Sequence, residues 1–542
     1  MSSATTVQPD AYQRMEPGLV DGAMRKIGVL GMSPRQQQLN RLWAYYCTQQ
    51  YDARKVDWDG TPHMGHQEHE VVATAGFIPP VFVDQSGAAL PLKFRRPTAP
   101  YHLARVVVKR FTSLLFSERQ HPTIDVPGDA DTEDYIDGLV DAGRLWAAMV
   151  QARNFGGAMG SVAIGFKFAN GHLRIEVHDP RWLHPVFVSR EDLKLASLEK
   201  RYMYPVEERD AKGVWQNVWY WYRRVIDRFT DTIYAQVPVG DGEEPDWERA
   251  IEERVEHQLG FCPVVWIQNQ VVSDDIDGEP DCLGVYEMSE EIDALLAQST
   301  KGTKANCDPT VVIVTPDSFD DVLKKGSENA IKLTAGSAAY MEINGSGLKS
   351  ARELASELRG LALEVVQCVT DHPDVANRTA TEIERVYSSM LARADEFREQ
   401  YGERGVKPLV EMILEAVRRL SEPREVDGQI VRAAIEVPPS IKDGQLQSRK
   451  LGTGKMIQLR WPRYFAPSLA DAQQAVQAAV AAKAGGVVDQ VTASKLVAEA
   501  FGVTDVTAMI EVLRKEQAQE EQALTSQLLS ESALSSKPEA QA

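Results

Sequence analysis

Helical periodicity dominates the first part of the chain. After a polar N-terminal segment, residues 33–51 carry apolar side chains on one stripe, and residues 101–116 repeat the pattern. Residues 131–157 extend it as far as Gly156 and Gly157, a pair that suits a helix C-cap. Three helices are therefore predicted before the first strand.

The pattern then changes to alternation with a period of two. Two alternating runs, 161–168 and 173–177, flank the dipeptide Asn170-Gly171. Because Asn-Gly adopts the positive φ angles of a tight turn, these runs predict a β-hairpin. Further strands, rich in aromatic and β-branched residues, are predicted at 215–239 and 259–269.

Two helices bracket a short β-rich module in the second half. A helical pattern starts at Leu283 and reaches the polar stretch 298–306, a β-rich segment covers 309–345, and a second helical pattern covers 350–369. The second helix carries one apolar stripe, formed by Leu354, Leu358, Leu361, Val365 and Val369. The two helices also have polar faces, with Glu353, Glu357, Arg359 and Glu364 on the second and Gln298, Lys301 and Lys304 on the first.

A polar loop at 371–378 separates this second helix from a much longer one. Thr379 and Glu382 match a capping box at its start. Interruptions within it predict a kink near its middle, at Gly402, Gly405 and Pro408. A strand-like connector, a final helical region and a polar tail follow, so the predicted fold class is α+β, predominantly α.

Composition indicates a folded chain in a reducing compartment. Hydrophobic residues make up 43% and charged residues 25%. No apolar run of about 18 residues and no signal-peptide pattern is present, so we expect neither a membrane span nor secretion. The five cysteines show no CxxC spacing, which argues against a zinc site or a disulfide framework.

Motifs for catalysis are weak. The phosphate-loop-like run 452–456 lacks the hydroxyl residue after its lysine, because Met456 stands there. The calcium-loop-like run 273–284 ends at Gly284 instead of the bidentate glutamate. Neither a Gly-x-Ser-x-Gly elbow nor a His-Glu-x-x-His motif occurs, and no cofactor is predicted. The default expectation is a protein that is not an enzyme.

One polar cluster keeps an enzymatic alternative open. Imidazole and carboxylate side chains that suit a divalent transition metal gather at His63, His66, Glu68, His69 and Glu70. Pro62 and Gly65 disfavour a helix there, so a solvated loop is the favoured interpretation. The alternative is a metal-dependent hydrolase or nuclease that uses this cluster.

The order of elements resembles the portal protein of tailed bacteriophages, from Leu39 to Glu521. A mixed first half, a helix-bracketed β module, a loop and a long interrupted helix occur in that order. The resemblance implies a flexible segment at 1–38, a wing at 39–282, a first stem helix at 283–306, a clip at 307–343, a second stem helix at 344–370, a tunnel loop at 371–378, a long kinked helix with a return to the wing at 379–467, a crown at 468–523 and a disordered tail at 524–542.

The resemblance also implies roles for individual residues. The tunnel loop would narrow a DNA channel and consists of Asp371, His372, Pro373, Asp374, Val375, Ala376, Asn377 and Arg378. Basic residues that could face DNA are Arg378, Lys301, Lys304 and Lys349. The clip rim, expected to contact a terminase or an adaptor, consists of Asp317, Phe319, Asp320, Asp321, Lys324 and Lys325.

The implied assembly is a dodecameric ring at a unique capsid vertex of the virion, assembled in the host cytoplasm. Its expected partners are the terminase large subunit, the major capsid protein and scaffold, a head-completion adaptor, and double-stranded DNA bound without sequence specificity. The polar helix faces would suit subunit contacts and a wet lumen. A net charge of −19 agrees with DNA that slides, since extensive phosphate contacts would hold it. A capsid or tail-adaptor subunit is a further alternative.

Overall fold

The computed structural model describes the chain in segments, and two compact units are distinguished. The first unit comprises Met1–Val369 and Ala392–Pro462, and the second comprises Thr370–Leu391 and Arg463–Ala542. The described residues are 33–47, 100–169, 171–189, 193–209, 215–238, 247, 251–257, 259–272, 275–307, 310–314, 337–341, 346–370, 385–421, 424–426, 429–431, 435, 437–442, 445–449, 451–452, 457–465, 469–486, 488, 492–494, 497 and 514.

Among the described residues, four helices precede the first long strand: α2 Pro34–Cys47, α4 Leu103–Phe116, α5 Ala130–Gly143 and α6 Leu145–Met159. The helices α2, α4 and α6 pack together, with Leu39, Val108 and Met159 in a shared core. The prediction of one helix over 131–157 is wrong, because Arg144 adopts a left-handed conformation (φ 51°) that separates α5 from α6. The C-cap of α6 is Gly160 (φ 93°), beyond the glycine pair.

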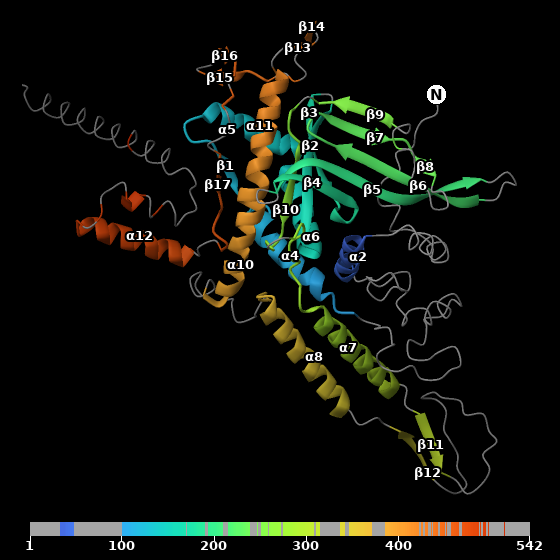
Figure 1. The fold of residues 1–542 in the computed structure, drawn as a ribbon. Coiled ribbons are helices and arrows are strands. Elements are labelled where there is room, and N and C mark those ends of the chain that lie inside the picture. Colours follow the sequence, from blue (N-terminus) through green and yellow to red (C-terminus); the bar gives the residue numbers. More distant parts are fainter. Residues whose placement is uncertain are drawn as a thin grey trace, which may run out of the picture. The chain divides into compact units, whose positions relative to one another are not determined.

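Two antiparallel sheets follow these helices (Figure 1). The smaller has the order β10-β2-β3, with β2 Ser161–Ala169, β3 His172–His178 and β10 Val264–Gln268. The larger has the order β4-β5-β6-β7-β9, with β8 also paired to β6. Its strands are β4 Leu183–Ser189, β5 Lys194–Arg209, β6 Trp215–Ile226, β7 Thr230–Tyr234, β8 Val237–Pro238 and β9 Ile251–Glu256. A one-turn 3₁₀ helix, η3 Pro180–Trp182, connects β3 to β4.

The predicted hairpin is confirmed, because β2 and β3 pair from Ala163↔His178 to Ala169↔His172. A core cluster that includes Leu198 and Trp266 joins the two sheets. An ion cluster also joins them, since Arg224 on β6 contacts Glu176 on β3 at 2.7 Å and Asp231 on β7 at 2.7 Å.

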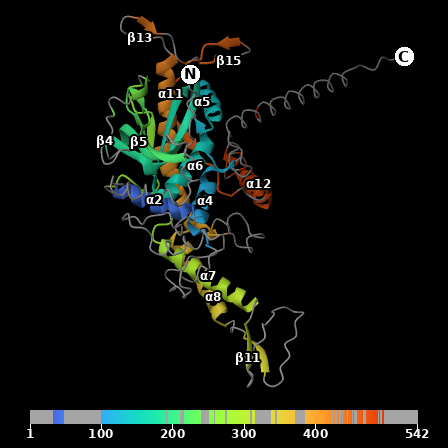
Figure 2. The same ribbon diagram turned by 90° about the vertical axis from the view of Figure 1, so that its right-hand side faces the viewer.

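The second half of the first unit contains a helix pair and a small sheet. Helix α7 covers Tyr286–Cys307 and α8 covers Ser346–Val365. Between them in the chain, β11 Thr310–Val314 pairs antiparallel with β12 Ser337–Met341. The two helices lie side by side in both ribbon views (Figures 1 and 2). Helices and antiparallel sheets together make the fold α+β, as predicted.

A long helical run follows and packs on the smaller sheet, β10-β2-β3, and on α6. It consists of α10 Ser388–Arg398, the π-helical segment η5 Glu399–Val406 and α11 Lys407–Ser421. The interruption predicted near Gly402 and Gly405 therefore takes the form of a π segment. Both glycines are required by close packing, since a Cβ on Gly402 would lie 2.8 Å from Trp461 and one on Gly405 would lie 2.8 Å from Ile267.

The remaining described elements are short strands and one helix. They are β1 Thr123–Asp125 paired with β17 Gln458–Arg460, β13 Arg424–Val426 paired with β14 Gln429–Val431, β15 Ser440–Lys442 paired with β16 Gln445–Gln447, and α12 Leu469–Ala484. In the second unit, which contains α12, the rings of Tyr387 and Phe465 are 5.6 Å apart. Within the described part of the chain, no helix is long and apolar enough to cross a membrane.

Candidate functional site

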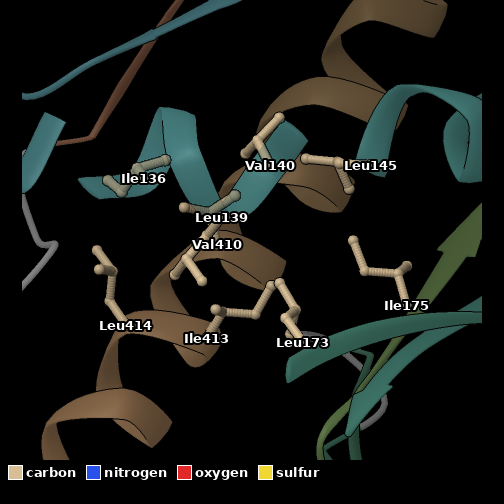
Figure 3. Close-up of a pocket in the computed structure, with 9 residues that line it drawn as sticks. All are labelled: Ile136, Leu139, Val140, Leu145, Leu173, Ile175, Val410, Ile413 and Leu414. Atoms are coloured by element: carbon tan, nitrogen blue, oxygen red, sulfur yellow. The ribbon is translucent and has the colours of Figure 1, made fainter. Parts of the chain in front are cut away.

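A cavity lined only by apolar side chains lies between α5, α6, β3 and α11 (Figure 3). Its lining includes Ile136, Leu173 and Ile413, and its volume is about 10 Å³. A dry apolar space of that size holds at most one water molecule, and it offers no polar atom to bind one. We therefore interpret it as a packing gap.

The helix pair α7–α8 is the candidate site, and small residues bring its helices together. A Cβ on Gly302 would lie 2.3 Å from Leu348 Cδ2, so any larger residue there would force the Leu348 side chain to move. On α8, the buried positions include Ala355 (4% exposed) and Ala362 (0%). Arg352 Nη2 donates to Thr303 Oγ1 at 3.2 Å, which adds a polar link between the helices.

The outer surface of α8 exposes its large apolar side chains. Leu354 is 45% exposed, Leu361 is 46% exposed and Val365 is 56% exposed. Together with half-buried Leu358 they follow spacings of four, three and four residues, which is the spacing of a coiled-coil seam. The stripe predicted from the sequence is thus real, but within one chain α7 does not cover it.

Charged groups lie beside this stripe. Lys349 Nζ is 3.7 Å from Glu353, and both side chains are largely exposed, so this ion pair contributes little to stability. Glu357 and Glu364 are also exposed. Of the three lysines predicted to face DNA, only Lys349 has a described side chain; Lys301 lies on α7, but its side chain and that of Lys304 are outside the described set.

Side chains from the N-terminal part of the chain hold the helix pair. Tyr45 on α2 donates to Glu290 at 2.6 Å, and burial together with Glu290 raises the pKa of Tyr45. The backbone N–H of Tyr101 donates to Asp293, and Arg359 Nε donates to the hydroxyl of Tyr101 at 3.0 Å. Both helices of the pair therefore contact the residues just before α4.

A fully buried polar network lies next to the start of α7. Arg153 on α6 makes a two-point ion pair with Asp281, with N–O distances of 3.0 and 3.1 Å. Asn269 donates to Asp281 at 3.0 Å and accepts from Tyr401 at 2.9 Å. Burial alone would lower the pKa of Arg153, but the adjoining Asp281 carboxylate raises it, so Arg153 stays charged.

The glycine pair on α6 makes room for this network. A Cβ on Gly156 would lie 1.9 Å from the hydroxyl oxygen of Tyr401. A Cβ on Gly157 would lie 2.1 Å from Arg153 Nη1 and 2.6 Å from Asp281 Oδ2. Sequence reasoning missed the network; the two adjacent glycines were its only signal, and they suited a helix end equally well.

The other residues singled out by the sequence lie outside the described part of the chain. These are the tunnel-loop residues 371–378, the clip-rim residues Asp317, Phe319, Asp320, Asp321, Lys324 and Lys325, the capping-box pair Thr379 and Glu382, and the His63 to Glu70 cluster. Among the residues that the structure describes, no group of three or more His, Cys, Asp or Glu side chains could hold a metal ion.

Comparisons with known proteins give distant structural likenesses. No protein-family model matches the sequence, and no curated protein matches it. Among solved structures, the chain is similar to one in the "Virion of native gene transfer agent (GTA) particle", with 12% identity, 80% of this chain and 98% of that chain covered, and a TM-score of 0.33. It is also similar to one in the "Neck of empty GTA particle computed with C6 symmetry", with 12% identity, 75% and 90% covered, and a TM-score of 0.37. Likeness at this level assigns neither a family nor a function.

Proposed function

We propose that this chain is a portal-type structural subunit of a tailed-phage-like particle, which forms a ring-shaped channel for genome packaging and ejection. The observation that carries the proposal is the order of elements in the second half. Two packed helices, α7 and α8, bracket the two-stranded sheet β11–β12, and a long helix interrupted by a π segment follows. That order is the one on which the sequence resemblance to portal proteins rests.

The exposed stripe of α8 supports an assembly of several copies. Leu354, Leu361 and Val365 are each about half exposed and follow one helical seam. Such a contiguous apolar stripe favours burial against another helix, because leaving it in water forfeits hydrophobic free energy. In a closed ring, every copy presents the same helix pair at the same height, so a helix of the next copy is the natural partner.

The remaining roles follow from the resemblance. Residues 371–378 form the tunnel loop that narrows the channel, and Lys301, Lys304, Lys349 and Arg378 supply the few basic contacts to DNA. The clip-rim residues Asp317, Phe319, Asp320, Asp321, Lys324 and Lys325 dock the terminase large subunit during packaging and a head-completion adaptor afterwards. The major capsid protein and scaffold surround the ring at one vertex of the virion. No catalysis is proposed for this chain.

Particle mass and rotational symmetry test the ring. Native mass spectrometry and electron-microscope class averages of purified protein should give about a dozen subunits around a central channel. A chain that stays monomeric alone and in the presence of capsid and scaffold proteins would refute the proposal. A chelator-sensitive hydrolase activity of that monomer would favour the metal-dependent alternative.

A pair of variants tests the role of the stripe. Leu361→Glu places a charge in the middle of the seam and should abolish ring formation, whereas Glu357→Gln, at an exposed position one turn away, should leave the ring intact. The readout is the mass distribution of the two variants at equal concentration. If Leu361→Glu still forms rings of normal mass, the stripe is not part of the subunit contact, although the ring itself is not refuted.

A further inference from the structure

A single buried arginine contacts both inner ends of the helix pair. Arg393 lies on α10 and is 8% exposed. Its Nη1 donates to the carbonyl oxygen of Val366, the residue directly after α8. Its Nη2 donates at 3.0 Å to the carbonyl oxygen of Asp281, in the turn that leads into α7. One guanidinium thus joins three segments that are far apart in the sequence.

Aromatic rings fix the position of this guanidinium. The Cζ atom of Arg393 lies 5.3 Å from the ring centroid of Phe111 and 5.6 Å from that of Phe397. The Phe397 ring centroid also lies 4.1 Å from the Cζ atom of Arg153, so this ring contacts both arginines. Asp281 is therefore held twice, by Arg153 at its carboxylate and by Arg393 at its backbone carbonyl.

The end of α8 is built to receive a cation. The N–H of Cys368 donates to Leu363 O at 2.8 Å and that of Gln367 donates to Glu364 O at 3.0 Å, which closes the helix in a Schellman motif. The free carbonyls at a helix C-terminus carry the negative end of the helix dipole. A positively charged side chain at Val366 O satisfies one of them and favours the end of α8 at this position.

We propose that Arg393 couples the start of α7 and the end of α8 to the long helix, so that both ends are held there together and are released together when Arg393 lets go. We call this contact the latch. The contacts inside the pair, such as that between Gly302 and Leu348, do not involve Arg393. Loss of the latch therefore loosens the joint at 281–285 and 366–368 while the pair stays packed. This inference rests on the geometry of the joint and is independent of the proposed function.

Native cysteines report on each end of the joint. Cys282 (1% exposed) follows Asp281, and Cys368 (3% exposed) lies two residues after Val366. Cys262 (4% exposed) is buried in the core between the two sheets, away from the joint. The rate at which each thiol reacts with an alkylating reagent measures how often its surroundings open.

The experiment is pulsed alkylation of the full chain with peptide-resolved mass spectrometry. In Arg393→Met, the labelling rates of Cys282 and Cys368 should both rise by roughly tenfold or more, since two bonds from a charged donor are lost. The rate for Cys262 should stay as in the wild type. Arg398→Met, on the same helix, removes a bond to Pro462 O instead and should leave Cys282 and Cys368 protected.

Three outcomes would overturn the inference. Unchanged labelling at both joint cysteines would mean that Arg393 does not hold the joint. A rise at one of them alone would reduce it to a cap for one helix, and a parallel rise at all three thiols would show a purely global contribution to folding. If Arg393→Met does not fold, Arg393→Lys keeps the charge and reaches one carbonyl at a time, and the same labelling pattern is expected with smaller increases. Hydrogen exchange of the Cys368 and Val285 amides gives a second measurement at the two ends.

Discussion

His178 should make the stability of this protein fall between pH 7 and pH 5. The residue ends β3 and is 3% exposed. Burial lowers its pKa from the ordinary value of 6.5 to about 3, and the nearby positive charge of Lys200 adds to this effect. Lys167 and Arg224 act in the same direction, whereas Glu176 opposes them.

The sign and size follow from proton linkage. The folded state keeps His178 neutral down to about pH 3, but the unfolded chain takes up a proton below pH 6.5. The unfolded state therefore binds more protons in this window, and stability is lost as the pH falls. At pH 5 the loss from this one group amounts to about 2 kcal/mol relative to neutral pH. Glu176 has a pKa of about 2 instead of the ordinary 4.5, so its contribution to folding stability is lost mainly below pH 5.

Urea unfolding followed by tryptophan fluorescence at pH 7 and pH 5 measures the effect. The wild type should lose about 2 kcal/mol more than His178→Gln on going from pH 7 to pH 5, since glutamine cannot take up the proton. His172→Gln, which changes an exposed histidine at the other end of β3, should keep the wild-type dependence. Equal losses in the wild type and His178→Gln would refute the assignment of His178 as a buried neutral group.

Two further predictions concern single backbone positions, and a third concerns the loop 371–378. Gly157→Ala should lower the free energy of unfolding by about 3 kcal/mol, because its Cβ displaces the buried Arg153. Gly138→Ala, at an open position in the middle of α5, should raise it by roughly 0.5–1 kcal/mol. Urea unfolding compares the two variants, and equal effects would contradict the packing argument. Gln367 has a φ of 52°, a left-handed conformation that strains any residue with a Cβ, so Gln367→Gly should raise the free energy of unfolding by about 1 kcal/mol. A free energy of unfolding below that of the wild type in the same assay would contradict this strain. If residues 371–378 hold packaged DNA, their deletion should yield particles with short or lost genomes, and full-length genomes in those particles would argue against a holding role.

Local signals made much of the fold predictable. The hairpin around Gly171 was predicted because the turn chemistry and the two alternating runs are adjacent in sequence, and the structure confirms it. The helix pair and the interruption of the long helix follow from periodicity and glycine in the same way. The break at Arg144 could not be predicted in this way, because a left-handed arginine between two helices does not change the hydrophobic periodicity.

The buried network could not be predicted, because it is formed by residues far apart in the chain. Arg153 and Asp281 are separated by 128 positions, and Asn269 and Tyr401 by 132. A pattern of single residues does not reveal which charged side chains are buried in pairs. The DNA-facing and docking residues stay predictions, since all of them but Lys349 lie where the structure describes no side chains.

Periodicity alone does not show which partner covers the apolar stripe of α8. The seam of Leu354, Leu358, Leu361 and Val365 has the same spacing whether its partner lies in the same chain or in another one. A pair of helices stabilised mainly by its own contact would bury these leucines against each other. Instead, Gly302 on α7 packs against Leu348 on α8, and Ala355, Ala362 and Leu363 are buried, while Leu354, Leu361 and Val365 are each about half exposed. Subunit contacts were predicted at the polar faces, and that prediction stays untested. In the proposed ring, the exposed apolar stripe beside those faces would add hydrophobic free energy to the contact when it is buried.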